Sequence, residues 1–281
     1  MCSPGVERKV IVMPGGGLCF GVKRAVEAAR NAPGPTAALG ELAHNPKVMD
    51  DLRRAGVRII ESREDAGPDE TVIVRSHGVA PEVMANLEAN ARDVIDATCP
   101  RVRRAQLAAS RSAAEGWPVV VVGRASHPEV EGVVGYAGDA TEVVSDAGEA
   151  RRLPHRDRRA VVFQTTFDPS SVDEVLEALG SVTGELKVHD TLCTVVAHRR
   201  ETVARLAEEV DAVVVVGGAN SSNTAALAQV VKKAGTPVYC VERAKDLPME
   251  GLGEYATLAV IGGTSTPWES LEEVAARLKG Y

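Results

Sequence analysis

The stretch CFGVKRAVEAA, residues 19–29, sets the pattern of this chain because two similar stretches follow it: CPRVRRAQLAA at 99–109 and CTVVAHRRETVARLA at 193–207. Each begins with Cys, has Val three residues later, and continues through basic residues into an Ala-rich run typical of an amphipathic helix. The copies divide the chain into near-thirds, which indicates three copies of one structural unit, although common solenoid repeats are much shorter. A helix N-terminus favours negative charge, so each Cys is biased toward thiolate, the form that binds metals or attacks electrophiles.

The composition is that of an ordinary globular protein. Its 281 residues predict about two domains and permit three, and the repeat favours three. Apolar residues make up 44% and aromatic residues only 3%, so the core is expected to consist of Val, Ala and Leu. The net charge of -7 gives no basic footprint for nucleic acid, and an anionic ligand therefore needs a local site.

The chain shows no targeting or membrane signal. No run approaches 18 apolar residues, and the start MCSPGVERKV lacks the pattern of a signal peptide, so we expect a cytoplasmic protein with no membrane partner. Five scattered cysteines argue against a disulfide framework and favour metal binding or catalysis. Cys240 is expected to be a packing residue, and Cys2 a free thiol near the chain end.

Continuous Val and Ile runs alternate with helical segments along the whole chain. Examples are KVIVM at 9–13, TVIV at 71–74 and VVVV at 213–216. Such runs predict parallel sheets covered on both faces, and therefore an α/β fold. The polar stretch RRLPHRDRR at 151–159 is expected to be an exposed loop.

Polar residues follow the predicted strands at their carboxyl ends, where parallel sheets bind ligands. Hydroxyls, amides, imidazoles and helix N-terminal N–H groups together suit a phosphate or diphosphate. The turn GGANSSN shows this best, since glycines let backbone N–H groups approach an anion, but no Lys-Ser/Thr follows as in a P-loop. These strand-end residues are His44, Asn45, Ser76, His77, Ser126, His127, Thr165, Thr166, Ser221, Ser222, Asn223, Thr264, Ser265 and Thr266.

Each of these residues also has a structural explanation. A Ser, Thr or Asn after a strand is the usual N-cap of the next helix, and a single His can be a core residue. Glu129 has the alternative of a surface helix position, but it lies two residues beyond His127, where it can deliver a proton. Their joint occurrence beside three repeated cysteines favours a shared site.

The three cysteines lack a C-x-x-C pair, so spacing alone is a weak metal signal and buried packing is the alternative. A closed zinc site needs four ligands, whereas three thiolates leave one position open for chemistry. Soft thiolates also suit an iron–sulfur cluster with one iron that the protein does not bind.

The motifs identify a resemblance to the 4-hydroxy-3-methylbut-2-enyl diphosphate reductase family, which acts last in the methylerythritol phosphate pathway to isoprenoids. The resemblance implies a trefoil of three α/β domains, 14–98, 99–192 and 193–281, around a 4Fe-4S cluster, with the N-terminal strand 1–13 joining the third. The matching motifs span about residues 11–270 and are GLCFGVKRA, LAHNPKV, RSHGV, DATCP, SHPEVEG, QTT, NSSNT and TSTP.

The resemblance also implies an activity and a site. The activity is reductive dehydroxylation of (E)-4-hydroxy-3-methylbut-2-enyl diphosphate to isopentenyl and dimethylallyl diphosphate, with ferredoxin or flavodoxin as electron donor. Cys19, Cys99 and Cys193 would bind the cluster and leave one iron for the substrate hydroxyl. His127, Glu129 and Thr165 would be catalytic, handling that hydroxyl and its protons. The substrate-binding residues would be His44, His77, His127, Thr165, Thr166, Ser221, Ser222, Asn223 and Ser265.

The sequence departs from the family pattern in three places. The usual C-x-A-T-x-x-R reads CTVVAHRR, which introduces Val196 and His198; the usual Lys before NSSN is Ala219; and AGAS reads GGTS. These departures leave open the alternative of a diverged enzyme for another allylic or acetylenic diphosphate. Two further alternatives are a non-catalytic sensor of a cluster or phosphate ligand and a zinc-bound or metal-free diphosphate binder. Retention of Glu129 and Thr165 counts against the sensor.

Basic residues after the cysteines suggest a collar that receives an acidic electron donor, with solvated helix faces as the alternative. We define this basic collar as Lys23, Arg24, Arg101, Arg103, Arg104, Arg199 and Arg200.

Overall fold

Three four-stranded sheets, each entirely parallel, carry the fold in the computed structural model, which describes residues 8–280. The predicted α/β class with parallel sheets is confirmed. Cys2 and the first residues of the predicted N-terminal strand lie outside the described residues.

Each sheet has its own strand order. Sheet 1 is β1 (Lys9–Val12), β12 (Thr257–Gly262), β10 (Ala212–Val216) and β11 (Val238–Val241). Sheet 2 is β3 (Val57–Ile60), β2 (Thr36–Leu39), β4 (Thr71–Val74) and β5 (Asp93–Asp96). Sheet 3 is β7 (Glu142–Val144), β6 (Val119–Val122), β8 (Arg156–Phe163) and β9 (Thr183–His189).

Helices connect the strands. The α-helices are α1 (Phe20–Asn31), α2 (Pro46–Arg54), α3 (Pro81–Asn90), α4 (Pro100–Ala114), α5 (Pro128–Ala137), α6 (Ala147–Ala150), α7 (Val172–Ser181), α8 (Thr194–Glu209), α9 (Ser222–Lys233), α10 (Met249–Leu252) and α11 (Trp268–Lys279). The 3-10 helices are η1 (Arg63–Asp65), η2 (Pro169–Ser171) and η3 (Ala244–Asp246).

The described chain forms two compact units. The first unit contains the segment up to Val26, Glu41–Ala55 and the chain from Thr194 onward; the second contains Glu27–Gly40 and Gly56–Cys193. Sheet 1 belongs to the first unit, and sheets 2 and 3 belong to the second. The division into three domains stays a prediction.

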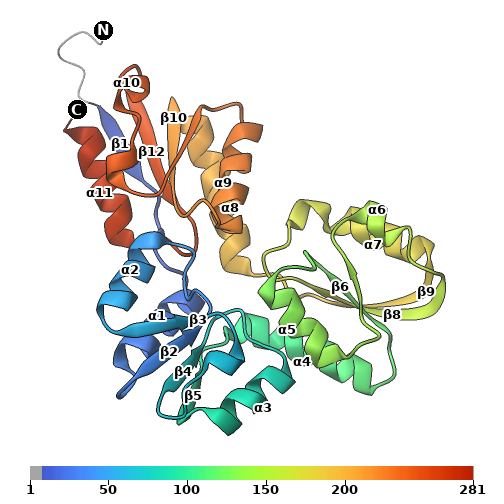
Figure 1. Ribbon diagram of the computed structural model, residues 1–281. Helices are drawn as coiled ribbons and strands as arrows, with labels where there is room; N and C mark the ends of the chain where they lie inside the picture. Colours follow the sequence, from blue (N-terminus) through green and yellow to red (C-terminus); the bar gives the residue numbers. More distant parts are fainter. Residues whose placement is uncertain (1–7, 281) are drawn as a thin grey trace. The chain divides into compact units, whose positions relative to one another are not determined.

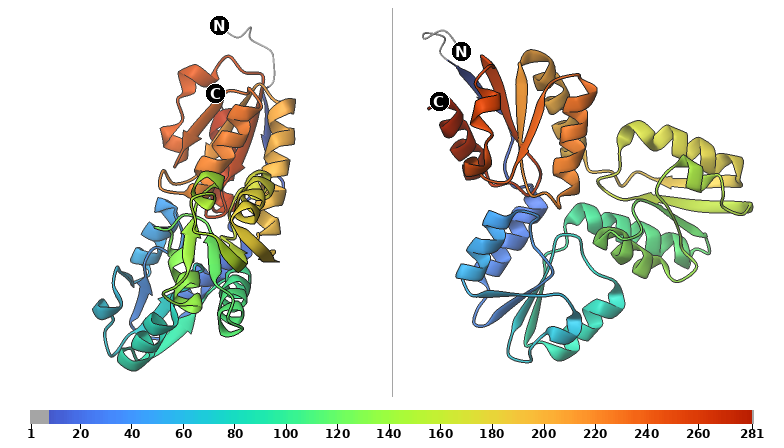
Figure 2. Two further views of the ribbon diagram at one scale, coloured as in Figure 1. Left: turned by 90° about the vertical axis from the view of Figure 1, so that its right-hand side faces the viewer. Right: turned by 45° about the horizontal axis from the view of Figure 1, so that its top comes forward.

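Helices cover both faces of sheet 1. Val214 and Val260 pack with α11 on one face, whereas Val213 and Ile261 pack with α8 and α9 on the other. Figure 1 shows this sandwich, with α11 on one side of β12 and β10 and the other two helices opposite, and the right-hand view of Figure 2 shows it again. Side chains alternate between the faces of a strand, so an unbroken run of Val supplies both cores.

Sheet 3 has the same construction. Val120 and Phe163 pack with α6 and α7, whereas Val121 and Val162 pack with α4 and α5. In sheet 2, Leu87 of α3 packs against the face formed by β2 and β4. The core therefore consists mainly of Val, Ala and Leu, as the composition predicts.

The expected loop at 151–159 is only partly a loop. Its last four residues begin β8, and Arg159 is 0% exposed. The Arg159 guanidinium donates to Glu142 (Nε to Oε2, 2.8 Å), to the Thr183 hydroxyl (2.7 Å) and to the Pro154 carbonyl (2.6 Å). The prediction of an exposed loop was wrong here because partners distant in sequence satisfy a charged side chain inside the fold.

Replacing Glu142 with Ala should lower the free energy of unfolding of the second unit by about 3–5 kcal/mol, because it leaves the buried Arg159 charge without its carboxylate. Urea unfolding followed by circular dichroism would measure the change. The matched control is Glu115→Ala, which removes the partner of Lys187 in a more exposed pair and should cost at most about 1 kcal/mol. Equal effects of the two substitutions would contradict the role of Glu142 as the carboxylate partner of the buried Arg159.

Within the described residues, no helix combines the length and apolar character needed to cross a membrane.

Candidate active site

Cys19, Cys99 and Cys193 occupy equivalent places in the three sheets. Each follows an outer strand, β1, β5 or β9, and directly precedes a helix, α1, α4 or α8. In each case the Cys backbone N–H donates to a carbonyl beyond the end of the neighbouring strand. These carbonyls belong to Thr264 (2.9 Å), Ser76 (3.0 Å) and Thr165 (2.8 Å).

The repeated setting suits metal-binding thiols. All three residues are thiols rather than disulfides and are half-buried at the start of a helix, where the helix dipole favours negative charge. Among the described residues, no three His, Cys, Asp or Glu side chains form a group that could hold a metal ion. Cys19 belongs to the first unit and the other two cysteines to the second, so their common ligand role stays a prediction.

Four of the predicted site residues come together in the second unit. The rings of His77, after β4, and His127, after β6, meet edge to face with centroids 5.2 Å apart. His127 is the N-cap of α5, and its Nδ1 accepts the Glu129 backbone N–H at 3.1 Å. Because Nδ1 accepts this bond, the neutral His127 ring carries its proton on Nε2.

The Glu129 carboxyl is bound to Thr165 at the end of β8. The Thr165 backbone N–H donates to Oε1 (2.5 Å), and its hydroxyl donates to Oε2 (2.9 Å). Glu129 is only 2% exposed, which contradicts the alternative of a surface position. Burial raises the pKa of Glu129 to about 7, against the opposing effect of the two bonds from Thr165. A carboxyl with this pKa is suited to donate a proton near neutral pH.

Thr166 and Thr191 complete the end of β8. The half-buried Thr166 hydroxyl accepts a bond from Gln164 Nε2 at 3.0 Å. The buried Thr191 hydroxyl bonds both the Phe163 N–H (2.9 Å) and the Phe163 carbonyl (2.7 Å), which ties the segment before Cys193 to β8. Sequence reasoning missed Thr191, since nothing in its local pattern indicates this long-range contact.

Several predicted diphosphate residues lie in the first unit, at the ends of β10 and β12. Ser221 is buried and caps α9, with its hydroxyl accepting the Thr224 N–H at 3.3 Å, so the N-cap explanation is correct for this residue. Asn223 Nδ2 donates to the Thr264 hydroxyl at 2.8 Å and links the two strand ends. Ser265 is buried and Ser222 is half-buried.

His44 reaches the same region through the segment before α2. Its Nδ1 lies 3.4 Å from the Glu41 carboxylate, and the following Asn45 caps α2. The backbone of His44 lies so close to the glycine turn after β10 that a Cβ built on Gly218 would be 2.6 Å from the His44 carbonyl oxygen. Only glycine allows this approach, which places His44 beside the turn that leads to Ser221.

Replacing Gly218 with Ala should lower the free energy of unfolding by about 1–3 kcal/mol, because the added methyl group must displace the His44 backbone. Thermal or urea unfolding would measure it. Gly180 is the control: a Cβ there meets no atom within 4 Å, so Gly180→Ala in α7 should be neutral or stabilising. A neutral Gly218→Ala would show that the close contact is absent in solution.

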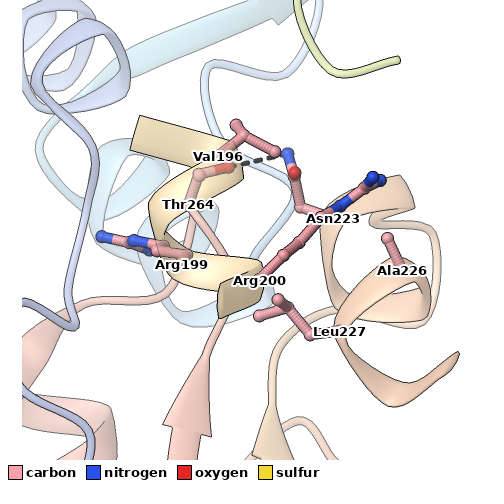
Figure 3. A pocket seen from close by; sticks show the side chains of 7 residues that line it. All are labelled: Val196, Arg199, Arg200, Asn223, Ala226, Leu227 and Thr264. Atoms are coloured by element: carbon pink, nitrogen blue, oxygen red, sulfur yellow. Dashed lines mark hydrogen bonds between the residues drawn. The ribbon is translucent and has the colours of Figure 1, made fainter. Parts of the chain in front are cut away.

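A small recess in the first unit contains two departures from the family pattern, Val196 and Thr264, the latter at the third position of GGTS. Figure 3 shows Val196 there beside Asn223 and Thr264, with Arg199 and Arg200 leaving α8 in opposite directions. His198 is exposed and lies 3.8 Å from Glu201, so of the two departures in α8 only Val196 lines the recess. The lining residues are Val196, Arg199, Arg200, Asn223, Ala226, Leu227 and Thr264.

The predicted basic collar is wrong at Arg199. This side chain is only 7% exposed, and its guanidinium donates to backbone carbonyls inside the first unit. Arg103 is half-buried and paired with Asp96 and Tyr136. Lys23, Arg24 and Arg104 are exposed, whereas Arg101 and Arg200 are half-buried. Amphipathic spacing did not distinguish Arg199 from its surface neighbours.

The fold and the site define an α/β protein with three parallel sheets, each of which presents one thiol beyond an outer strand. The protonatable Glu129 carboxyl is bound to Thr165, and the Thr165 carbonyl in turn accepts the backbone N–H of Cys193. The chain belongs to the LytB protein family, which it matches over residues 10–279. It is 37% identical to the 4-hydroxy-3-methylbut-2-enyl diphosphate reductase of Geobacter sulfurreducens over 276 residues, 97% of this chain and 98% of that protein. The corresponding enzyme of Caldanaerobacter subterraneus is 34% identical over 96% of both chains.

Solved structures agree with the fold. One of (E)-4-hydroxy-3-methyl-but-2-enyl diphosphate reductase, described as the terminal enzyme of the non-mevalonate pathway, is 34% identical with a TM-score of 0.73, covering 98% of this chain and all of that one. A reductase from Plasmodium falciparum is 22% identical with a TM-score of 0.87, covering 96% of this chain and 87% of that one, and supports the fold alone.

Proposed function

We propose that this protein is a 4-hydroxy-3-methylbut-2-enyl diphosphate reductase, as its full-length relatives are named. The reaction replaces the substrate's C–O bond with a C–H bond and releases the hydroxyl as water. It consumes two electrons and two protons, and the position of the new C–H bond decides between isopentenyl and dimethylallyl diphosphate. The chain must therefore hold a diphosphate, deliver a proton to an oxygen and accept electrons.

The observation that carries this proposal is the pair Glu129 and Thr165. A buried carboxyl with a pKa of about 7 is bound through both oxygens to Thr165, and the Thr165 carbonyl accepts the backbone N–H of Cys193. A proton source thus lies next to a residue that contacts a candidate cluster ligand. Pure binding of a diphosphate would need no such acid.

The three thiols fit an iron–sulfur cluster. They are the soft ligands that such clusters prefer, and each is held in the same way after an outer strand. We propose Cys19, Cys99 and Cys193 as ligands of a 4Fe-4S cluster. When bound, it would pass the electrons from the external donor to the substrate and would offer an iron position open to the substrate.

The remaining site residues have binding roles in this proposal. Ser221, Ser222 and Asn223 offer hydroxyl and amide groups at the N-terminus of α9, which attracts a diphosphate, and Ser265 offers a hydroxyl beyond the end of β12. His44 and His77 contribute imidazole donors. His127 orients Glu129 through its Nδ1 and presents Nε2–H to the substrate, while Thr165 passes the Glu129 proton toward the leaving hydroxyl, beside Thr166.

Electrons are expected from an acidic cytoplasmic carrier such as ferredoxin or flavodoxin. The exposed members of the basic collar, Lys23, Arg24 and Arg104, remain candidates for its docking, and Arg199 is removed from the set. Donor-dependent turnover should then decrease as ionic strength rises.

The experiment that tests the function is anaerobic. The protein is reconstituted with iron and sulfide, reduced viologen is added, and bleaching is followed after addition of 4-hydroxy-3-methylbut-2-enyl diphosphate. Rapid bleaching with formation of the two C5 diphosphates would support the proposal. A brown protein that does not bleach the dye would instead indicate another substrate, and a colourless protein would refute the cluster.

A further inference from the structure

Arg199 of α8 joins two separate segments of the first unit. Its Nη1 donates to the carbonyls of Gly262 (3.4 Å) and Gly263 (2.9 Å), beyond the end of β12. Its Nη2 donates to the carbonyls of Gly15 (3.1 Å) and Gly17 (2.6 Å), in the loop after β1. Each terminal nitrogen of Arg199 therefore donates to the carbonyls of one segment.

Both segments lead directly to proposed site residues. The loop that contains Gly15 and Gly17 continues into Cys19, and the segment after Gly263 is Thr264 and Ser265. The two segments also meet directly, since the Cys19 N–H donates to the Thr264 carbonyl at 2.9 Å. Arg199 therefore holds the backbone on both sides of this bond.

The loop before Cys19 needs such support. Three consecutive glycines give it great conformational freedom, and Gly15 and Gly17 adopt positive φ angles of 69° and 94°. Without tertiary bonds, a loop of this kind would leave the Cys19 thiol in many positions. Arg199 supplies two bonds to this loop from a helix far along the chain.

Stability alone does not explain a guanidinium at this position. Burying a charge is costly, and the other buried positions of α8 include the apolar residues Val196, Val203 and Leu206. An apolar residue at position 199 would continue this face without that cost but would offer no donors to the four carbonyls.

We propose that Arg199 is a positioning residue, which fixes the place of Cys19 relative to Thr264 and Ser265. The positioning is a property of the folded first unit, and its importance for catalysis rests on the proposed function. A Lys at this position would keep the charge, but its single nitrogen cannot replace a planar fork that bonds two segments at once.

Hydrogen exchange in the protein without cluster or substrate tests this proposal. In Arg199→Met, peptides covering residues 14–22 and 262–266 should exchange about tenfold faster or more, because the bonds that close these segments are lost. Arg199→Lys should give a smaller increase. The control is Arg205→Met in the same helix, where the side chain is exposed and exchange should not change.

Unchanged exchange in both segments would overturn the proposal, and so would an equal increase throughout sheet 1, which indicates general destabilisation. Should Arg199→Met fail to fold, Arg199→Lys provides the same comparison. After reconstitution with iron and sulfide, Arg199→Met should retain less iron per chain than Arg205→Met. Because exchange is measured without substrate, a failure of the proposed enzyme activity would not alter its outcome.

Discussion

Replacing Cys19 with Ser is expected to lower viologen-dependent turnover by more than about 100-fold. Loss of a residue that only contacts a metal ligand costs up to about 100-fold, and loss of the ligand itself should cost more. A serine hydroxyl binds iron poorly, since it is a harder ligand and stays protonated at neutral pH. The fold should survive, because the Cys19 contact with Thr264 uses the backbone N–H. Iron content, visible absorption and dye bleaching would measure the loss.

Cys240→Ser is the control for this experiment. Cys240 is an exposed thiol on β11, so the prediction that it is a packing residue was wrong, and its replacement should leave iron content and turnover unchanged. Cys99→Ser and Cys193→Ser should behave like Cys19→Ser, since the three cysteines occupy equivalent places. Full turnover in any one of these three variants would remove that cysteine from the ligand set.

Replacing Glu129 with Gln is expected to lower kcat by about 10²–10⁴-fold while leaving KM nearly unchanged. Gln keeps the size of the side chain and an oxygen for the Thr165 N–H, but it has no proton to deliver. Single-turnover kinetics and substrate binding would separate the two effects. Glu131→Gln, an exposed neighbour on α5, should have wild-type activity. Normal turnover in Glu129→Gln would exclude Glu129 as the acid.

The pH dependence gives a second test of Glu129. Because the protonated carboxyl is the active form, wild-type turnover should decrease as pH rises through about 7.

The Glu129 carboxyl also affects the stability of the fold. Its pKa is about 7 when folded and about 4.5 when unfolded, so the folded state binds more protons between these values, and stability decreases as pH rises through this window.

Above pH 7 the raised pKa of Glu129 should lower the free energy of unfolding by about 3 kcal/mol relative to its value at pH 4. Glu129→Gln should lack this dependence and therefore gain stability relative to wild type at pH 8, but not at pH 4. Urea unfolding at the two pH values would measure the difference. A pH-independent difference between the proteins would contradict the raised pKa of Glu129.

The sequence by itself determined the local elements and the type of site. Unbroken Val runs identified strands buried on both faces, as in β6 and β10, because alternate side chains of one run point to opposite faces of the sheet and pack into the core on each side. Polar residues after these strands identified candidate site positions, because parallel strands end at one edge. Repeated Cys-led helices identified three equivalent thiols.

Only the tertiary structure decided which partners these residues have. Arg159 and Arg199 look like surface residues by local pattern, but carboxylate and carbonyl groups distant in sequence bind them in the interior. The burial of Glu129 and its bonds to Thr165 likewise depend on the pairing of β6 with β8. Sequence periodicity reports which way a side chain points, whereas burial and pKa depend on what long-range contacts place around it.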